Sequence, residues 1–334
     1  MILNDRLKER DLPIIDLDKV GQGEVMVEAC LKHGFFYIDN RQGQVIDPKI
    51  VDQLQRMSQE FFLLSASNKS KYAIEKSSSL TGYVGFESIT TFVAHANESF
   101  FFHSAGLFPS NQKEQSIGCI FEPALTQYAE LCWKLNEKIY KHLAPYLDLK
   151  NVRTTDGFLK SWTDGFRERL WVGRLLHYPS NSGIIAAHND VGLLTILNQD
   201  QTGGLQVWFQ EKWIDVAPIQ NTFVVNIGDI LQNWSSGLLK STRHRVNNKK
   251  AVDRYSMTFL PLFDKSCEVY MQEKNEWKYP YQHLAERYYT IFKYLAESVQ
   301  DSVNCLQGKS PREIDDFHQT IVRDVQKRWY QEIG

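Results

Sequence analysis

Residues 187–200, AHNDVGLLTILNQD, open an apolar run with two polar side chains, His188 and Asp190. In an extended segment, residues two apart point to the same face of a sheet, so both side chains can reach one point. Burying two such groups costs free energy unless something binds them. The stretch therefore predicts a β-strand that begins beside a binding site.

Short runs typical of β-strands surround this stretch. Eight of them follow one another between Trp171 and Phe263, separated by turn signals such as Asn-Ser-Gly and Gly-Gly. So many short strands in under 100 residues favour an all-β barrel or a jelly roll. The runs are WVGRLLHY, GLLTIL, GLQVWF, KWIDV, TFVVNI, DILQNW, KSTRHRV and RYSMTFLPLF.

Helical patterns lie on both sides of the β-rich region. Apolar residues recur every three or four positions in residues 47–64 and 122–147. We therefore predict an α+β fold in one domain over residues 1–300. Its parts are a mostly helical segment at 1–165, the jelly-roll core at 166–265 and a helix at 280–300.

Residues 301–334 are predicted to form a helical extension. Ser310, Pro311 and Glu313 make a capping box at the start of a helix over residues 311–331. Its apolar stripe must be covered, and we expect it to pack back on the helical N-terminal part rather than on a second chain. A monomer is therefore expected.

Composition excludes several classes of protein. The chain has 334 residues and a formal net charge of −2, so no strong field attracts nucleic acid or an anionic membrane. No apolar run approaches the length of a membrane span. The odd number of scattered cysteines is typical of free thiols in a reducing compartment. We expect a cytoplasmic protein; the cysteines are Cys30, Cys119, Cys132, Cys267 and Cys305.

A third metal ligand is available in the same β-rich region. His244, in STRHRV, follows Asp190 by 54 residues, which leaves room for several strands between them. Two imidazoles and one carboxylate form the facial triad of non-haem Fe(II) oxygenases, which leaves positions open for a cosubstrate and O₂. We interpret the remaining histidines as surface or structural residues: His33, His95, His103, His142, His177, His283 and His318.

A possible carboxylate clamp follows on the next strand. Arg254 and Ser256 are two residues apart in RYSMTF, so both point to one face. A guanidinium and a hydroxyl together can hold a carboxylate. The apolar sequence SMTFLPLF indicates that the strand is buried, and a buried arginine needs an anion.

These motifs resemble one family in their order and spacing. HNDVGLLTIL (188–197), GGLQVW (203–208), the segment 224–246 and RYSMTFLPLF (254–263) resemble the core of the isopenicillin N synthase-like 2-oxoglutarate/Fe(II) oxygenases. LPIIDL and EACLKHGFFYIDN resemble the N-terminal segment of that family. The resemblance spans roughly residues 11–295 and implies a double-stranded β-helix (jelly roll) flanked by helices.

The resemblance also implies roles for individual residues. His188, Asp190 and His244 match the iron ligands. Arg254, Ser256 and Tyr178 match the group that binds the distal carboxylate of 2-oxoglutarate.

The family resemblance says less about the residues that line the substrate pocket. GYVGF (82–86) and FFFH (100–103) lie where the family covers the barrel mouth, so Tyr83 and Phe102 are candidate substrate-lining residues. The chain departs from the family at Leu176, where many members have an asparagine near the cosubstrate. Leucine cannot donate a hydrogen bond there.

The implied activity is oxidation of a small-molecule metabolite. 2-Oxoglutarate, bound to Fe(II), is decarboxylated by O₂ to succinate and CO₂, and the substrate is hydroxylated, desaturated or cyclised. Two alternatives remain open: an Fe(II) oxidase of the isopenicillin N synthase type that does not use 2-oxoglutarate, and a non-catalytic ligand-binding module on this scaffold. Succinate release distinguishes the enzyme that uses 2-oxoglutarate from the oxidase.

Overall fold

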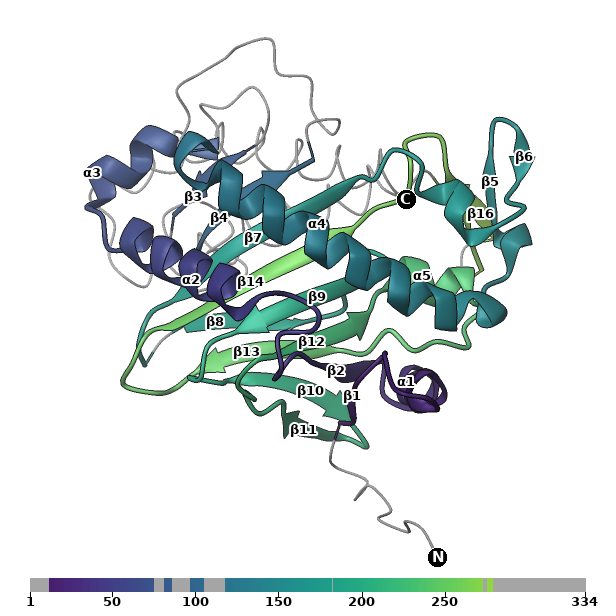
Figure 1. The fold of residues 1–334 in the computed structure, drawn as a ribbon, viewed down its shortest axis with the longest axis horizontal. Helices are drawn as coiled ribbons and strands as arrows, with labels where there is room; N and C mark the ends of the chain where they lie inside the picture. The colour runs from purple at the N-terminus through teal and green to yellow at the C-terminus, as the bar shows by residue number, and fades with distance from the viewer. Residues whose placement is uncertain are drawn as a thin grey trace, which may run out of the picture.

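Two facing β-sheets with helices on one side form the centre of the molecule (Figure 1). The structure is a computed structural model. It describes residues 12–74, 81–85, 97–104, 118–181, 183–272 and 275–278. The predicted helix at 280–300 and the extension at 301–334 lie outside the described residues.

The larger sheet contains eight strands in the order β1-β2-β12-β9-β14-β7-β4-β3. All of its pairs are antiparallel except β1 with β2. The strands are β1 (Ile14–Ile15), β2 (Phe35–Asp39), β3 (Gly82–Val84), β4 (Glu98–His103), β7 (Trp171–Tyr178), β9 (Leu194–Gln199), β12 (Thr222–Ile227) and β14 (Arg254–Pro261).

The smaller sheet faces it and has the order β11-β10-β13-β8. Its strands are β8 (Gly183–His188), β10 (Leu205–Phe209), β11 (Lys212–Asp215) and β13 (His244–Asn248). From β7 to β14 the chain changes sheet at every step except between the paired strands β10 and β11, which is the connectivity of a jelly roll. A separate four-stranded sheet comprises β5 (Val152–Thr154), β6 (Gly157–Phe158), β15 (Glu268–Met271) and β16 (Glu276–Lys278).

Helices cover the outer face of the larger sheet. Helix α2 (Pro48–Phe62) begins at Asp47, whose side chain accepts a hydrogen bond from the backbone N–H of Lys49. It lies beside the long helix α4 (Gly118–Leu143) across β7 and β14 (Figure 1). The other helices are α1 (Gln22–Lys32), α3 (Ala66–Lys69) and α5 (Asp229–Trp234).

The strands of the larger sheet separate two hydrophobic cores. Leu175, Met257 and Phe259 belong to the core that packs against the helices. Their neighbours Leu176 and Tyr178 belong to a second core shared with the smaller sheet. Because side chains alternate along a strand, even-numbered residues of β7 and β14 face the interior between the sheets.

The fold class predicted from the sequence is confirmed. The predicted helices at 47–64 and 122–147 correspond to α2 and α4, and the β-rich region supplies strands to both facing sheets. One predicted strand was wrong: DILQNW forms the helix α5, which begins after Gly228. The N-terminal part also contributes strands, since β2 and β4 extend the larger sheet.

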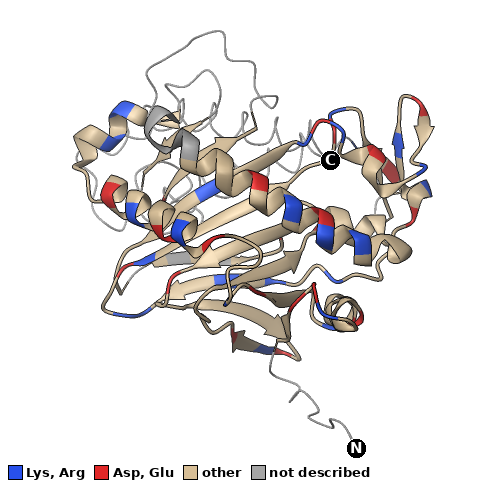
Figure 2. Cartoon of the chain, viewed as in Figure 1, with Lys and Arg blue, Asp and Glu red and all other residues tan. Residues whose placement is uncertain are grey.

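Among the described residues, no helix is long and apolar enough to cross a bilayer. Acidic and basic residues alternate over α2 and α4 without a patch of one sign (Figure 2).

Candidate metal centre

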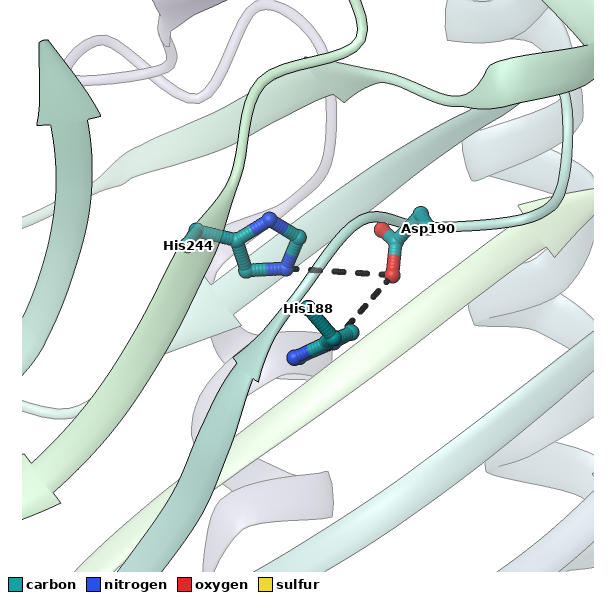
Figure 3. Close-up of side chains that lie close together, drawn as sticks. All are labelled: His188, Asp190 and His244. Carbon is teal, nitrogen blue, oxygen red and sulfur yellow. Dashed lines mark ion pairs between the residues drawn. The ribbon is translucent and has the colours of Figure 1, made fainter. Parts of the chain in front are cut away.

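His188, Asp190 and His244 converge between the two sheets (Figure 3). His188 ends β8, His244 begins β13, and the two are paired across these strands. Asp190 lies in the connection that follows β8. One ligand atom from each residue lies within 4.8 Å of the other two. Asp190 Oδ1 is 3.5 Å from His188 Nε2 and 3.7 Å from His244 Nε2.

The second oxygen of Asp190 is held by the larger sheet. Asp190 Oδ2 accepts hydrogen bonds from the hydroxyl of Thr195, at 2.5 Å, and from the amide of Asn226, at 2.8 Å. Thr195 on β9 and Asn226 on β12 are paired residues. These contacts leave Oδ1 directed at the two imidazoles. Sequence reasoning missed both residues, although each is a polar residue within an apolar strand.

A close backbone approach fixes the connection that carries Asp190. Gly228 lies so near that an added Cβ would be 2.2 Å from the carbonyl oxygen of Gly192 and 3.0 Å from that of Asp190. The backbone N–H of Asp229 donates to the carbonyl of Asp190 at 2.8 Å. The start of α5 therefore positions Asp190.

The protonation states suit metal binding. Burial alone would raise the pKa of Asp190, but His244, His188 and the Asn226 hydrogen bond together hold it well below its usual value. Burial lowers the pKa of His244, and attraction to Asp190 offsets this only in part. A carboxylate and a neutral imidazole, the ligating forms, are therefore favoured near neutral pH.

A fully buried guanidinium lies further along the same interior. Arg254 has no solvent exposure. Its Nη1 donates to the Ser256 hydroxyl at 3.1 Å, its Nη2 to Gln199 Oε1 at 3.2 Å, and its plane lies 4.6 Å from the Tyr178 ring centre. Its Nε has no hydrogen-bond partner, and no acidic residue of the described ranges pairs with it. Arg254, Ser256 and Tyr178 are thus brought together as the sequence predicted, with Gln199 added.

Tyr83 and Phe102 occupy a different place. Both belong to the core on the helix side of the larger sheet. The Tyr83 hydroxyl donates to Glu98 Oε2, and Phe102 packs on Trp171. The structure therefore places neither ring in the space between the sheets that holds the metal-ligand candidates.

The structure also places Leu176, where the sequence departs from the family, and Asn189, which stands between His188 and Asp190 in the chain. Leu176 is buried on the interior face, paired with Ser256 on one side and Ser99 on the other. The Asn189 amide donates to the carbonyl and hydroxyl of Ser241, both at 3.1 Å, so it points away from its neighbours His188 and Asp190.

Comparison with known proteins agrees with this geometry. The 2OG-Fe(II) oxygenase superfamily matches residues 174–260, and a second family, described as the N-terminal part of the non-haem dioxygenase in morphine synthesis, matches residues 12–117. A probable iron/ascorbate oxidoreductase of Dictyostelium discoideum is 31% identical over 315 residues, which cover 78% of this chain and 83% of that protein. The chain belongs to the 2OG-Fe(II) oxygenase superfamily.

Two other similar proteins come from different organisms. A homoarginine-6-hydroxylase of Glycine max is 30% identical over 263 residues, which cover 70% of this chain and 75% of that protein. The crystal structure of a full-length Neurospora crassa protein in complex with α-ketoglutarate and 5-formyluracil has a TM-score of 0.63 and 22% identity, and covers 86% of this chain and 97% of that one. This member of the superfamily is therefore a 2-oxoglutarate-dependent dioxygenase that uses Fe(II) and O₂.

Proposed function

We propose that His188, Asp190 and His244 bind the catalytic Fe(II). The support is geometric and chemical: two imidazole nitrogens and one carboxylate oxygen converge, and this donor set is the facial triad of Fe(II) oxygenases. Thr195 and Asn226 orient the carboxylate in the way that outer partners orient metal ligands.

Arg254, Ser256 and Tyr178 are proposed to bind the distal carboxylate of 2-oxoglutarate, with Gln199 orienting the guanidinium. The observation that carries this proposal is the Arg254 side chain, which is fully buried, lacks an acidic partner among the described residues and leaves Nε without an acceptor. A buried cation without an anion is costly, so the site is complete only when an anionic ligand binds.

The register of β9 relates the two sites. Thr195 contacts Asp190, while Gln199, on the same face of β9, contacts Arg254. The proposed metal ligands and the proposed clamp therefore lie at two points along one interior face, as a dicarboxylate bound to both requires. When bound, the iron supplies the oxidising chemistry that activates O₂ at the expense of 2-oxoglutarate. The protein orients the ligands, holds the cosubstrate and shields the interior from water.

The proposed reaction is hydroxylation, desaturation or cyclisation of a small-molecule metabolite with release of succinate and CO₂. The Dictyostelium relative is named a probable iron/ascorbate oxidoreductase. Consumption of 2-oxoglutarate is therefore the property to measure against the alternative that the sequence left open, an Fe(II) oxidase without 2-oxoglutarate. In that enzyme Arg254 and Ser256 would hold another carboxylate.

Anaerobic calorimetry with Mn(II), then with 2-oxoglutarate, tests both site assignments. The wild type should bind one metal ion and then the cosubstrate. His188→Ala and His244→Ala should lose metal binding while circular dichroism stays unchanged, and Asn189→Ala, whose amide points away, is the matched control. Unchanged metal affinity in the histidine variants would refute the ligand assignment. Metal binding without 2-oxoglutarate binding would favour the oxidase.

The assembly and location are also proposals. We infer a cytoplasmic monomer that contacts neither nucleic acid nor membrane, supported by a net charge of only −2. If the predicted C-terminal helix packs within its own chain, a protein ending at Gln307 should lose stability and keep its oligomeric state in light scattering. Dissociation of a dimer on this truncation would show the opposite.

A further inference from the structure

Arg174 is a second interior-facing arginine without an acidic partner. It lies on β7 with the same orientation as Leu176 and Tyr178, which face the space between the sheets. No ion pair joins it to any acidic side chain in the described part of the chain. The side chain is half-buried, so its charge is partly removed from water.

The guanidinium is held in a fixed orientation. Its Nη2 donates to the Ser99 hydroxyl at 3.2 Å, and its plane lies over the Phe101 ring, 4.5 Å from the ring centre. Its Nε is shielded from solvent and has no hydrogen-bond partner. Arg174 is therefore positioned, yet much of its capacity to donate hydrogen bonds is unused.

Thr258 offers a second unused donor beside it. Thr258 is the residue paired with Arg174 across β7 and β14, and its hydroxyl is buried without a hydrogen-bond partner. A hydroxyl and a guanidinium on adjacent strands and on the same face repeat the chemistry of Ser256 with Arg254. The interior thus contains two separate arginine–hydroxyl pairs.

The strand register relates this second pair to the metal-ligand candidates. Along β9, the interior-facing residues are Thr195, which contacts Asp190, then Leu197, then Gln199, which contacts Arg254. Thr258 is paired with Leu197, so its level lies between the metal and the cosubstrate clamp. Arg174 is two strands from β9, which corresponds to about 10 Å across the sheet. A small molecule can span that distance.

We infer that Arg174 and Thr258 bind a carboxylate of the primary substrate, so that the enzyme oxidises small organic acids. This inference rests on the proposed function. The planar fork of Arg174, fixed by Phe101, matches a carboxylate. Two exposed arginines just before β7, Arg167 and Arg169, form ion pairs instead, with Asp164 and Glu137.

Paired ligands that differ only in charge test the inference. The probes are straight-chain and phenyl-substituted monocarboxylic acids, each beside its primary amide, titrated calorimetrically into protein loaded with Mn(II) and 2-oxoglutarate. Mn(II) replaces Fe(II) so that nothing turns over. We expect the best acid to bind about ten- to a hundredfold more tightly than its amide, because a charge-assisted hydrogen bond is lost in the amide.

Variants of Arg174 and Thr258 distinguish a loss of carboxylate binding from a loss of the folded structure. Arg174→Gln should remove the preference for the acid, Arg174→Lys should retain part of it, and Thr258→Val should weaken it while leaving 2-oxoglutarate binding unchanged. Arg167→Gln, which alters an exposed arginine, is the matched control. The lysine variant keeps the test valid if the glutamine variant does not fold.

Three outcomes overturn the inference: no acid binds, amides bind as tightly as acids, or Arg174→Gln and Arg174→Lys both keep the full preference. The loading step distinguishes this failure from failure of the proposed function. If Mn(II) and 2-oxoglutarate do not bind to the wild type, the proposed function is wrong. If they bind and the acids show no advantage, only the substrate inference is wrong.

Discussion

The amide of Asn226 donates a hydrogen bond of 2.8 Å to Asp190 Oδ2 and so fixes which oxygen faces the histidines. The Thr195 hydroxyl binds the same oxygen from the neighbouring strand. The carboxylate is therefore oriented before any metal arrives, and the larger sheet sets the geometry of a site whose histidines come from the smaller one.

Asn226→Ala should weaken metal binding. Loss of an outer partner of a metal ligand typically costs about ten- to a hundredfold in affinity. Anaerobic titration with Fe(II) or Mn(II) measures the change. Asn189→Ala is the control, because that amide binds Ser241 instead. Equal affinities for the wild type and Asn226→Ala would show that Asn226 does not orient Asp190.

Gly228→Ala should displace the backbone that carries Asp190. An added Cβ would lie 2.2 Å from the carbonyl oxygen of Gly192, and backbone cannot move aside as a flexible side chain can. We expect a lower melting temperature together with weaker metal binding. Gly192→Ala is a matched control in the same contact, since its Cβ would meet nothing within 4 Å. If both variants behave alike, the close approach at Gly228 does not set the site.

Arg254→Lys should raise the KM for 2-oxoglutarate. Lysine keeps the charge but loses the planar fork that reaches Ser256 and Gln199 together. A lost charge-assisted hydrogen bond is worth about 1.5–3 kcal/mol, or roughly ten- to a hundredfold in KM. Succinate formation against 2-oxoglutarate concentration measures the effect. Substrate oxidation that consumes no 2-oxoglutarate in the wild type would instead identify the oxidase.

The sequence predicted that His188, Asp190 and His244 lie together because most of the pattern is local. The spacing of His188 and Asp190 predicted side chains close together. They are close, although β8 ends at His188 and Asp190 lies in the connection after it, and a later strand supplies His244. The partners of Asp190 could not be predicted in this way. Thr195 and Asn226 meet Asp190 through the pairing of β9 with β12, and strand order is a property of the whole fold.

The positions of Tyr83 and Phe102 could not be predicted from the sequence for a different reason. The family resemblance placed FFFH over the barrel mouth, within the part of the chain predicted to be mostly helical. In the structure FFFH belongs to strand β4, which pairs with β7. Alternation along β4 then directs Phe100 and Phe102 to the helix-side core and Phe101 toward Arg174. An error of one residue in assigning the alternation of a strand moves every side chain of that strand to the opposite face of the sheet.

A buried ion-pair network around Glu98 should make stability depend on pH. Glu98 accepts hydrogen bonds from Lys69 at 2.6 Å and from the Tyr83 hydroxyl at 2.5 Å, and it pairs with His177 Nδ1 at 2.7 Å. Burial alone would raise the pKa of Glu98, but these three hydrogen bonds together lower it below its ordinary value. Its stabilising contribution is therefore complete above about pH 4.3, the ordinary pKa of a glutamate.

Glu98→Gln should remove that dependence. As pH falls through the lowered pKa of Glu98, the wild type loses the contribution, whereas the variant has no such carboxylate to protonate. At neutral pH the variant should be less stable by about 3–5 kcal/mol, because the buried Lys69 ammonium loses its partner. Urea unfolding at a series of pH values from neutral to acidic measures both effects. The exposed Glu60→Gln is the control, and a parallel pH dependence in all three proteins would exclude Glu98 as the cause.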